Sequence, residues 1–240
     1  MALIRRDDLL RKVKIRTFDY ATALREHAAK LIGAPITCGK GCAYCCYSKI
    51  CIDAGTGMVI ALELVAQGRW TPALVAKLTA ADAAMTRTNH HDWFNLRRPC
   101  VFLAEDEWGR GRCTIHAVRP YSCVTTFSAR PAIECSVGNN VASFQVADEQ
   151  IVQHLMPYHE ALLNGAGETR TWLLTIPGAV LYGYSLAAKE PPPASVLRLD
   201  QDQGPRGDAL ALVAWLDKHG AAHGARLAES AARAPLLGAP

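Results

Sequence analysis

Nine cysteines are spread unevenly along this chain of 240 residues, and they are the side chains best suited to do chemistry. Thiolates are preferred ligands of zinc and of iron–sulfur clusters, because both favour sulfur. Spacings of two and three residues let one turn of backbone present several sulfurs to the same point. We therefore predict a metal site built from two segments, with seven cysteine ligands: Cys38, Cys42, Cys45, Cys46, Cys100, Cys113 and Cys123.

The adjacent pair Cys45 and Cys46 constrains the kind of site. Consecutive side chains do not face one another on a helix and they diverge on a strand, so we do not expect the pair to ligate one mononuclear metal together. Either the two residues serve different centres, or one is a ligand while the other packs, bridges or contacts a substrate. Seven to nine thiols also exceed one tetrahedral site and are enough for about two. Whether Cys51 and Cys135 are ligands or small buried hydrophobes stays open.

Two other side chains near the cysteines are candidates for the site. Arg119 stands between a cysteine-bearing turn and a proline, and we predict that it binds the cofactor by holding carbonyls or thiolates. A neighbouring cation lowers the pKa of a thiol. His116 either completes the metal site or is a capping or core histidine. The catalytic residues are unknown at this stage, because the sequence has no Ser-His-Asp set, P-loop or dinucleotide fingerprint.

Four short motifs then occur in a recognisable order: Cys38-x3-Cys42-x2-Cys45-Cys46, Pro99-Cys100-Val101-Phe102-Leu103, Cys113-Thr114-Ile115-His116 and Arg119-Pro120-x2-Cys123. Over residues 36–125 this order resembles the YkgJ-like cysteine-cluster family, the CxxCxxCC domain, which implies chelation of zinc or iron. Bacterial flagellin lysine N-methylases contain a similar cysteine domain that is associated with an iron–sulfur cluster. The resemblance thus implies an iron–sulfur cofactor, with a [4Fe–4S] cluster favoured and zinc or a mononuclear or dinuclear iron site as alternatives. Methyl transfer does not follow from a shared domain.

The pattern Cys38-x3-Cys42-x-Tyr44-Cys45 also resembles the radical-SAM signature, in which three thiolates hold a [4Fe–4S] cluster whose open iron binds S-adenosylmethionine. That family needs a partial β/α barrel, with the motif directly after its first strand, whereas helical residues precede it here. Three hypotheses follow: an iron–sulfur or iron protein, with or without a modifying activity on a protein or small-molecule substrate; a structural zinc module; and a radical-SAM enzyme. Whether the protein is an enzyme stays open.

Composition and charge exclude several partners. The chain is 50% hydrophobic and 20% charged, and its formal net charge of +4 is too small to indicate a nucleic-acid or membrane surface. The N-terminal residues lack the pattern of a secretory signal. The uncharged run at 171–188 contains a proline and glycines and is shorter than a membrane span, so we interpret it as a core segment. We therefore predict a cytoplasmic protein, in which thiols stay reduced and available to metal.

The remaining sequence predicts a mainly α fold, with helices packed around an irregular cysteine-rich metal-binding centre and little regular β structure. We expect an N-terminal helical segment at 1–35, the metal-binding domain at 36–135 and a helical region at 136–240. Hydrophobic periodicity, caps and breakers predict helices at 1–36, 55–67, 72–91, 148–163, 177–189 and 208–219. Residues 97–135 are expected to be loop with one short hairpin and one or two helical turns.

Overall fold

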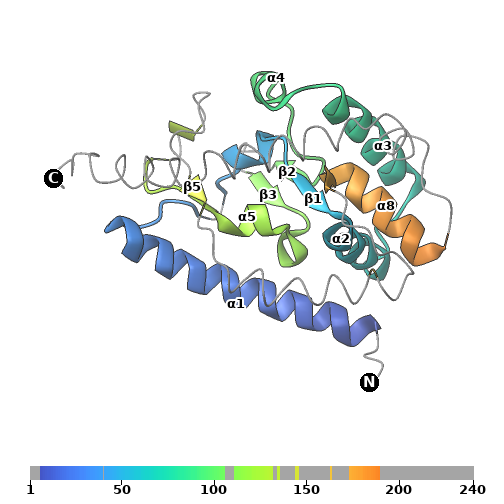
Figure 1. Cartoon of the computed structure of the whole chain (residues 1–240), viewed down its shortest axis with the longest axis horizontal. Helices are drawn as coiled ribbons and strands as arrows, with labels where there is room; N and C mark the ends of the chain where they lie inside the picture. Colours follow the sequence, from blue (N-terminus) through green and yellow to red (C-terminus); the bar gives the residue numbers. More distant parts are fainter. Residues whose placement is uncertain are drawn as a thin grey trace.

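The computed structural model describes residues 6–39, 41–105, 111–131, 134–135, 144–145, 163 and 173–189 (Figure 1). Most of them are helical: α1 (Arg6–Ile32), α2 (Ala54–Ala66), α3 (Pro72–Thr86), α4 (His90–Asn95), α5 (Tyr121–Thr125) and α8 (Ile176–Ala188), with the 3-10 turns η1 (Tyr44–Tyr47) and η2 (His116–Val118). The strands are short and form three antiparallel pairs: β1 (Cys51–Asp53) with β6 (Leu173–Thr175), β2 (Leu103–Glu105) with β3 (Gly111–Cys113), and β4 (Thr126–Phe127) with β5 (Phe144–Gln145). The prediction of a helix-dominated fold with little β structure is confirmed for the described residues.

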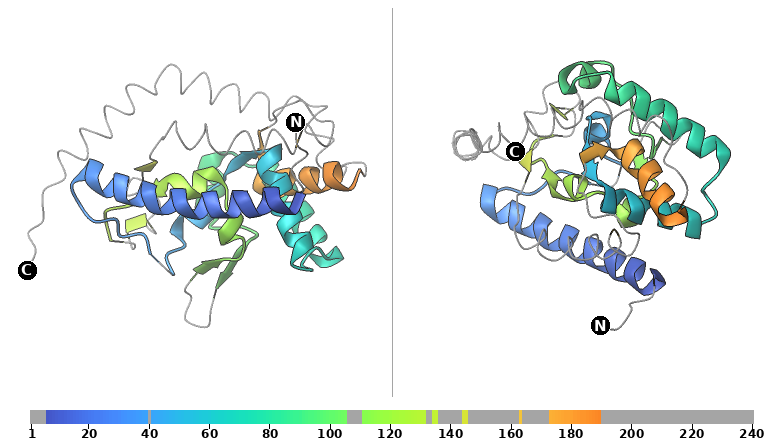
Figure 2. Two further views of the ribbon diagram at one scale, coloured as in Figure 1. Left: turned by 90° about the horizontal axis from the view of Figure 1, so that it is seen from below. Right: turned by 45° about the vertical axis from the view of Figure 1, so that its right-hand side comes forward.

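The main hydrophobic core lies where α2 and α8 pack together, with α3 also against α8 (Figure 2). Two glycines permit this close approach. A Cβ at Gly57 would lie 2.0 Å from the carbonyl oxygen of Ala179, and a Cβ at Gly183 would lie 2.3 Å from the backbone nitrogen of Met58. The two helices therefore meet backbone against backbone, and larger apolar side chains fill the space on either side of the contact: Val59, Ile60, Leu64, Val180 and Leu181.

The pairing of β1 with β6 fixes the starting points of these two helices. Each strand runs directly into its helix, and the last residue of each strand caps it. The Asp53 carboxylate accepts the backbone N–H of Thr56 at the start of α2, and the Thr175 hydroxyl accepts that of Gly178 at the start of α8. Sequence reasoning did not predict this strand pair, because each strand has only three residues and no clear alternation.

Helix α3 begins as predicted but ends early. The Thr71 hydroxyl accepts the backbone N–H of Leu74, and Pro72 occupies the first turn. The predicted helix from residue 72 to about 91 is wrong at its C-terminal end, since α3 stops at Thr86. Asn89 then caps a separate helix, α4, by accepting the backbone N–H of Asp92. An asparagine side chain that satisfies free N–H groups starts a new helix more readily than it continues an old one.

Helix α1 is one continuous helix along the side of the molecule that carries α5 and η2 (Figure 1). Its Leu24 and Ala28 are buried against Val124 and Phe127 in a second, smaller core. Near its other end, the Lys14 ammonium forms an ion pair of 2.5 Å with the buried carboxylate of Glu63 on α2. A buried carboxylate is stable only when it is paired, so this contact ties α1 to the main core.

Several other predictions can be compared with the structure. The helices expected at 55–67 and 177–189 are α2 and α8, and the hairpin and helical turns expected within 97–135 are β2–β3, η2 and α5. Most of α8 is buried, as predicted for a core segment, and no helix in the described part of the chain is long and apolar enough to cross a membrane. The helix expected at 208–219 lies outside the described residues, as does all but residue 163 of the one expected at 148–163. The domain boundaries stay predictions.

We expect Gly57→Ala and Gly183→Ala each to lower the free energy of unfolding by about 1–3 kcal/mol, because the added methyl group overlaps backbone atoms of the facing helix. Urea denaturation followed by circular dichroism measures the change. Gly33→Ala is the control, since a Cβ there meets nothing within 4 Å and the cost is limited to its positive φ of 63°. Equal destabilisation by all three substitutions would contradict the close α2–α8 contact.

Candidate metal centre

The first cysteine segment is a tight turn followed by η1. The backbone N–H of Cys42 donates to the carbonyl oxygen of Gly39 at 3.1 Å. Gly41 has a φ of 93°, in the region that favours glycine, so the chain can reverse sharply at this point. The turn leads into η1, which carries Cys45 and Cys46 on consecutive positions. The local backbone thus gathers these thiols without a regular helix or strand.

The thiols of Cys45 and Cys46 interact strongly enough to shift each other's pKa, downward for Cys45 and upward for Cys46. The prediction that the pair does not ligate one mononuclear metal together stays a prediction. It was based on the periodicity of α-helices and strands, whereas η1 is a single 3-10 turn of four residues with loop on both sides.

The second segment approaches through the β2–β3 hairpin. The backbone N–H of Cys100 donates to the carbonyl oxygen of Cys46 at 2.7 Å, and that of Gly111 donates to Gly41 at 3.3 Å. Cys113 is the last residue of β3 and pairs with the first residue of β2. These backbone bonds fasten both ends of the hairpin region to the first cysteine segment.

The third segment consists of η2, Arg119, Pro120 and α5. The backbone N–H of Cys123 donates to the carbonyl oxygen of Pro120 at 2.9 Å, which closes the first turn of α5. Proline suits this position because its own N–H would have no helical partner. Since α5 packs against α1, the position of Cys123 depends on the second hydrophobic core.

The thiols of the three segments are close enough to shift one another's pKa values. Burial raises the pKa of Cys123 well above its ordinary value, and the neighbouring thiols of Cys45, Cys100 and Cys113 raise it further. Burial also raises the pKa of Cys100, to about 11, with Cys113 and Cys45 adding to the effect. The pKa of Cys113 is raised for the same reason. Partly buried thiols in such a group can ionise together only if positive charge is added.

Cys45 is the exception, because its pKa is lowered to about 7. The main cause is the hydrogen bond that the Cys46 thiol donates to it, and the positive charge of Arg119 contributes. The same hydrogen bond strongly raises the pKa of Cys46. Cys45 is therefore the first thiol of the group to ionise, and a thiolate is the form that attacks electrophiles and binds metals.

Backbone amides reach several of the sulfurs. The N–H of Ser128 donates to Cys38 Sγ at 3.0 Å. Backbone hydrogen bonds from Tyr44, Phe102 and Ile115 lower the pKa values of the cysteines two positions before them, which are Cys42, Cys100 and Cys113 respectively. Hydrogen bonds of this kind favour the thiolate and tune the properties of metal–thiolate centres.

Arg119 lies among the thiols, at the position where sequence analysis expects a cofactor-binding cation. Burial lowers the pKa of its guanidinium, while four cysteines oppose that effect: Cys123, Cys113, Cys45 and Cys46. Its Nη1 is 2.6 Å from Nε2 of His116. Its Nε is buried and has no hydrogen-bond partner among the described residues. A buried N–H without an acceptor is costly, so this atom marks a place for a negatively charged group.

Three residues whose roles the sequence left open now have defined positions. His116 uses Nε2 to accept a hydrogen bond from Arg119, since a guanidinium can only donate. Burial and Arg119 lower its pKa, so the ring is neutral. Cys51 lies in β1, paired with Thr175. Cys135 is buried and is close enough to Cys38 and Cys42 to raise their pKa values.

The chemistry of this donor set suits a soft metal, but the side chains do not form a finished coordination sphere. Within the described ranges, no three His, Cys, Asp or Glu side chains are arranged so that they could hold a metal ion. None of the nine cysteines forms a disulfide, and the unpartnered Nε of Arg119 lies beside several of them. The residues thus fit a metal centre in type, charge and neighbourhood, and ligation requires their side chains to converge further.

Comparison with known proteins defines the class of this region. Residues 37–150 match the family model CxxCxxCC, described as a "putative zinc- or iron-chelating domain". These residues are therefore similar to the CxxCxxCC domain, and the resemblance seen in the sequence is confirmed for them. Searches of curated proteins and of solved structures gave no match. The match supports metal binding through a cysteine cluster, with zinc or iron as the metal.

In the metal-free protein, we expect Cys45 to be the thiol most reactive toward iodoacetamide at neutral pH. Its pKa of about 7 means that its thiolate is present above that pH and is lost below it, while the neighbouring buried thiols stay protonated. Alkylation rates mapped by mass spectrometry across a pH series give the midpoint.

Cys46→Ala removes the hydrogen-bond donor and should move that midpoint up toward the ordinary thiol value of about 8.5. Cys51→Ala is the matched control and should leave the midpoint in place. An unchanged midpoint in Cys46→Ala would show that the contact between the two thiols does not set the reactivity of Cys45.

Proposed function

We propose that this domain binds a metal centre through the thiolates around Arg119: Cys45, Cys46, Cys100, Cys113 and Cys123. The observation that carries the proposal is the partly buried Arg119 guanidinium beside these thiols, whose Nε–H is buried and has no partner in the described part of the chain. A buried cation is stable only beside negative charge. Several thiolates on one divalent ion or cluster carry a net negative charge, which this guanidinium would offset.

The raised pKa values of the same thiols support a metal rather than a set of free thiolates. Cys100, Cys113 and Cys123 resist ionisation because burial and their mutual proximity penalise negative charge. A coordinating metal deprotonates a thiol outright, because the ion supplies the positive charge that the protein lacks. In this proposal the metal offsets most of the negative charge of the thiolates, and the Arg119 guanidinium offsets the negative charge that is left.

More specifically, we propose that the metal centre is an iron–sulfur cluster, with [4Fe–4S] favoured. Its support is the position of Cys45 and Cys46 on consecutive residues of η1. Two sulfurs on consecutive residues are poorly placed to share one tetrahedral ion, whereas a cluster presents several iron atoms to neighbouring cysteines. Zinc is the alternative, in which the metal adds folding energy to a region made mostly of short turns.

The radical-SAM hypothesis has less support. It would use Cys38, Cys42 and Cys45 on a barrel of parallel strands, whereas every strand pair in the described residues is antiparallel. The centre proposed here also draws on the hairpin and α5, which a three-thiolate loop would not need. We propose no reaction or substrate. The cytoplasmic location and the absence of nucleic-acid partners stay predictions.

Purification under anaerobic conditions, with analysis of zinc, iron and acid-labile sulfide and an absorption spectrum, tests the proposal. We expect bound metal, and for a cluster a brown protein that contains sulfide. The triple substitution Cys100→Ser, Cys113→Ser and Cys123→Ser should lower the metal content at this centre at least tenfold, because it removes the ligands from two of the three segments. Cys51→Ser is the control and should retain the metal.

Each outcome separates the alternatives. Zinc in stoichiometric amount without colour or sulfide would exclude the cluster and leave the thiolate centre in place. Unchanged metal content in the triple variant, with its helical circular-dichroism signal intact, would contradict the centre around Arg119.

A further inference from the structure

Helix α1 ends before the residues that match the CxxCxxCC model, yet it reaches all three cysteine segments. The third segment packs on it directly, because Leu24 and Ala28 of α1 are buried against Val124 and Phe127. The other two segments are held through arginine side chains. A helix outside the matched residues is therefore in a position to set where the cysteine segments lie.

Arg25 of α1 binds the start of the first cysteine segment. Its guanidinium donates from Nη2 to the carbonyl oxygen of Ile36 at 2.8 Å, and from Nη1 to the carbonyl oxygen of Cys38. Two carbonyl oxygens suit the planar fork of a guanidinium, which the ammonium of a lysine does not provide. The contact therefore fastens the backbone on both sides of Thr37 to α1.

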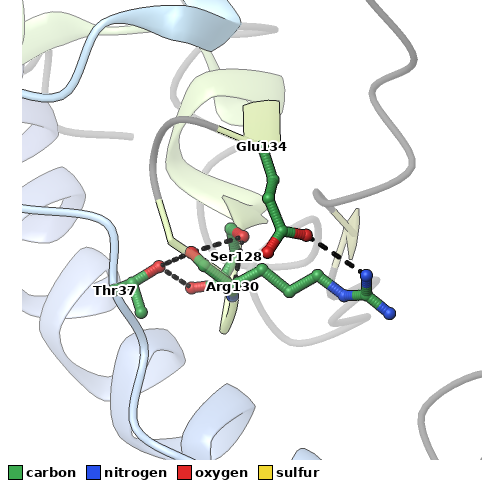
Figure 3. A network of polar contacts seen from close by, with 4 residues as sticks. All are labelled: Thr37, Ser128, Arg130 and Glu134. Atoms are coloured by element: carbon green, nitrogen blue, oxygen red, sulfur yellow. Dashed lines mark hydrogen bonds and ion pairs between the residues drawn. The ribbon is translucent and has the colours of Figure 1, made fainter. Parts of the chain in front are cut away.

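A polar network restrains the same residues from the chain after β4. The Thr37 hydroxyl donates to the carbonyl oxygen of Ser128 at 3.0 Å and to that of Arg130 (Figure 3). The backbone N–H of Thr37 donates to the same Ser128 oxygen at 2.8 Å. The N–H of Ser128 in turn donates to Cys38 Sγ at 3.0 Å. The start of the first segment is thus held both by Arg25 and by this network.

Arg69 binds the second cysteine segment, and the end of α2 places it there. Gly68 has a φ of 65°, and its N–H donates to the carbonyl oxygen of Val65 at 3.0 Å. The N–H of Arg69 donates to the carbonyl oxygen of Leu64 at 2.8 Å. These two bonds form a Schellman motif, which turns the chain sharply out of the helix. The Arg69 guanidinium then donates to the carbonyl oxygen of Thr114, directly after β3, at 2.8 Å.

A chain of polar contacts joins Arg69 back to α1. Its Nη1 donates to Gln67 Oε1 at 2.9 Å, and Nε2 of the same amide donates to Glu63 Oε1 at 2.6 Å. The other carboxylate oxygen of Glu63 pairs with the Lys14 ammonium at 2.5 Å. The amide oxygen can only accept and its nitrogen can only donate, so the charges at its two ends fix the direction of the Gln67 side chain.

We propose that α1 is a positioning element of the metal centre and that Arg25 and Arg69 are the residues through which it acts. The inference rests on the proposed function for what the cysteines bind, but the two contacts hold the cysteine segments whether or not metal is present. Ligands from three segments serve one centre only when the segments keep their relative positions. Because such coupling is reciprocal, an occupied centre should also hold α1 more firmly.

Hydrogen exchange in the metal-free full chain tests the two contacts separately. The amides of Thr37 and Thr114 are both hydrogen-bonded, so their exchange rates report how firmly each segment is held. Arg25→Leu should speed exchange at Thr37 about fivefold and leave Thr114 unchanged, and Arg69→Leu should do the reverse. Lys30→Leu removes another exposed cation of α1 and should alter neither. An exchange rate that does not respond to its own arginine would overturn the proposal.

Metal affinity tests the role of the same contacts in the centre. In a chelator competition with Zn²⁺, Arg25→Leu and Arg69→Leu should each weaken binding about fivefold, and the double variant about 25-fold. Arg25→Lys, which keeps the charge without the fork, should recover only part of the loss. Saturating Zn²⁺ should slow hydrogen exchange in α1 of the wild type about tenfold, and less in the double variant.

The outcomes distinguish this proposal from the proposed function. A wild-type chain that binds neither zinc nor iron, but in which each arginine controls its own segment, would contradict the proposed function and leave the hold of α1 on the cysteine segments in place. Equal Zn²⁺ affinity in the wild type and the double variant would overturn the role of α1 and leave the proposed function standing. An equal loss of affinity in Lys30→Leu would show a general effect of surface charge and would also overturn that role.

Discussion

The positive charge of Arg119 beside partly buried thiols is the constraint on which the rest of this domain depends. Burial opposes ionisation of Cys100, Cys113 and Cys123, and the thiols oppose one another when charged. The guanidinium is itself destabilised by burial and has one N–H without an acceptor in the described residues. The thiols need positive charge nearby in order to ionise, and the guanidinium needs negative charge nearby. A metal bound by the thiolates would let the thiols and Arg119 be charged at the same time.

The fold positions this arrangement from three directions. The first cysteine segment leads into β1 and α2, so its far end is fixed by the main core with α8. The hairpin that carries Cys113 is bonded to that segment through backbone contacts at Cys100 and Gly111. The turn with Arg119 and Cys123 is held by α5 against α1. The centre therefore joins the two hydrophobic cores, and metal binding there would couple to their stability.

Sequence predicted the parts whose signals are local. The prediction that a helix starts at Thr71 and Pro72 is confirmed by α3. The prediction that the apolar run with Pro177 is a core segment is confirmed by the buried helix α8. The order of the cysteine motifs predicted the resemblance to the CxxCxxCC domain, whose family model matches residues 37–150. The β1–β6 pair was missed, because a three-residue strand is defined by its distant partner rather than by its own pattern.

In the candidate site, too, the sequence predicted features that depend on neighbouring residues and missed features that depend on distant ones. Spacing drew attention to the cysteines of the motifs, but it did not reveal that Cys45 and Cys46 shift each other's pKa in opposite directions. Cys135 had no spacing signal at all. Its nearness to Cys38 depends on the contacts of Thr37 with Ser128 and Arg130, which join residues about ninety positions apart. Such contacts arise only when the whole domain folds.

The affinity of the metal centre in variants of Arg119 tests the central claim most directly. Arg119→Leu should weaken metal binding by about 10–100-fold in a chelator competition, while Arg119→Lys, which keeps the charge, should recover part of the loss. Arg98→Leu removes an exposed cation that lies over Trp93 and should leave the affinity unchanged. Equal affinity in Arg119→Leu and the wild type would contradict the view that this buried charge balances a thiolate–metal centre.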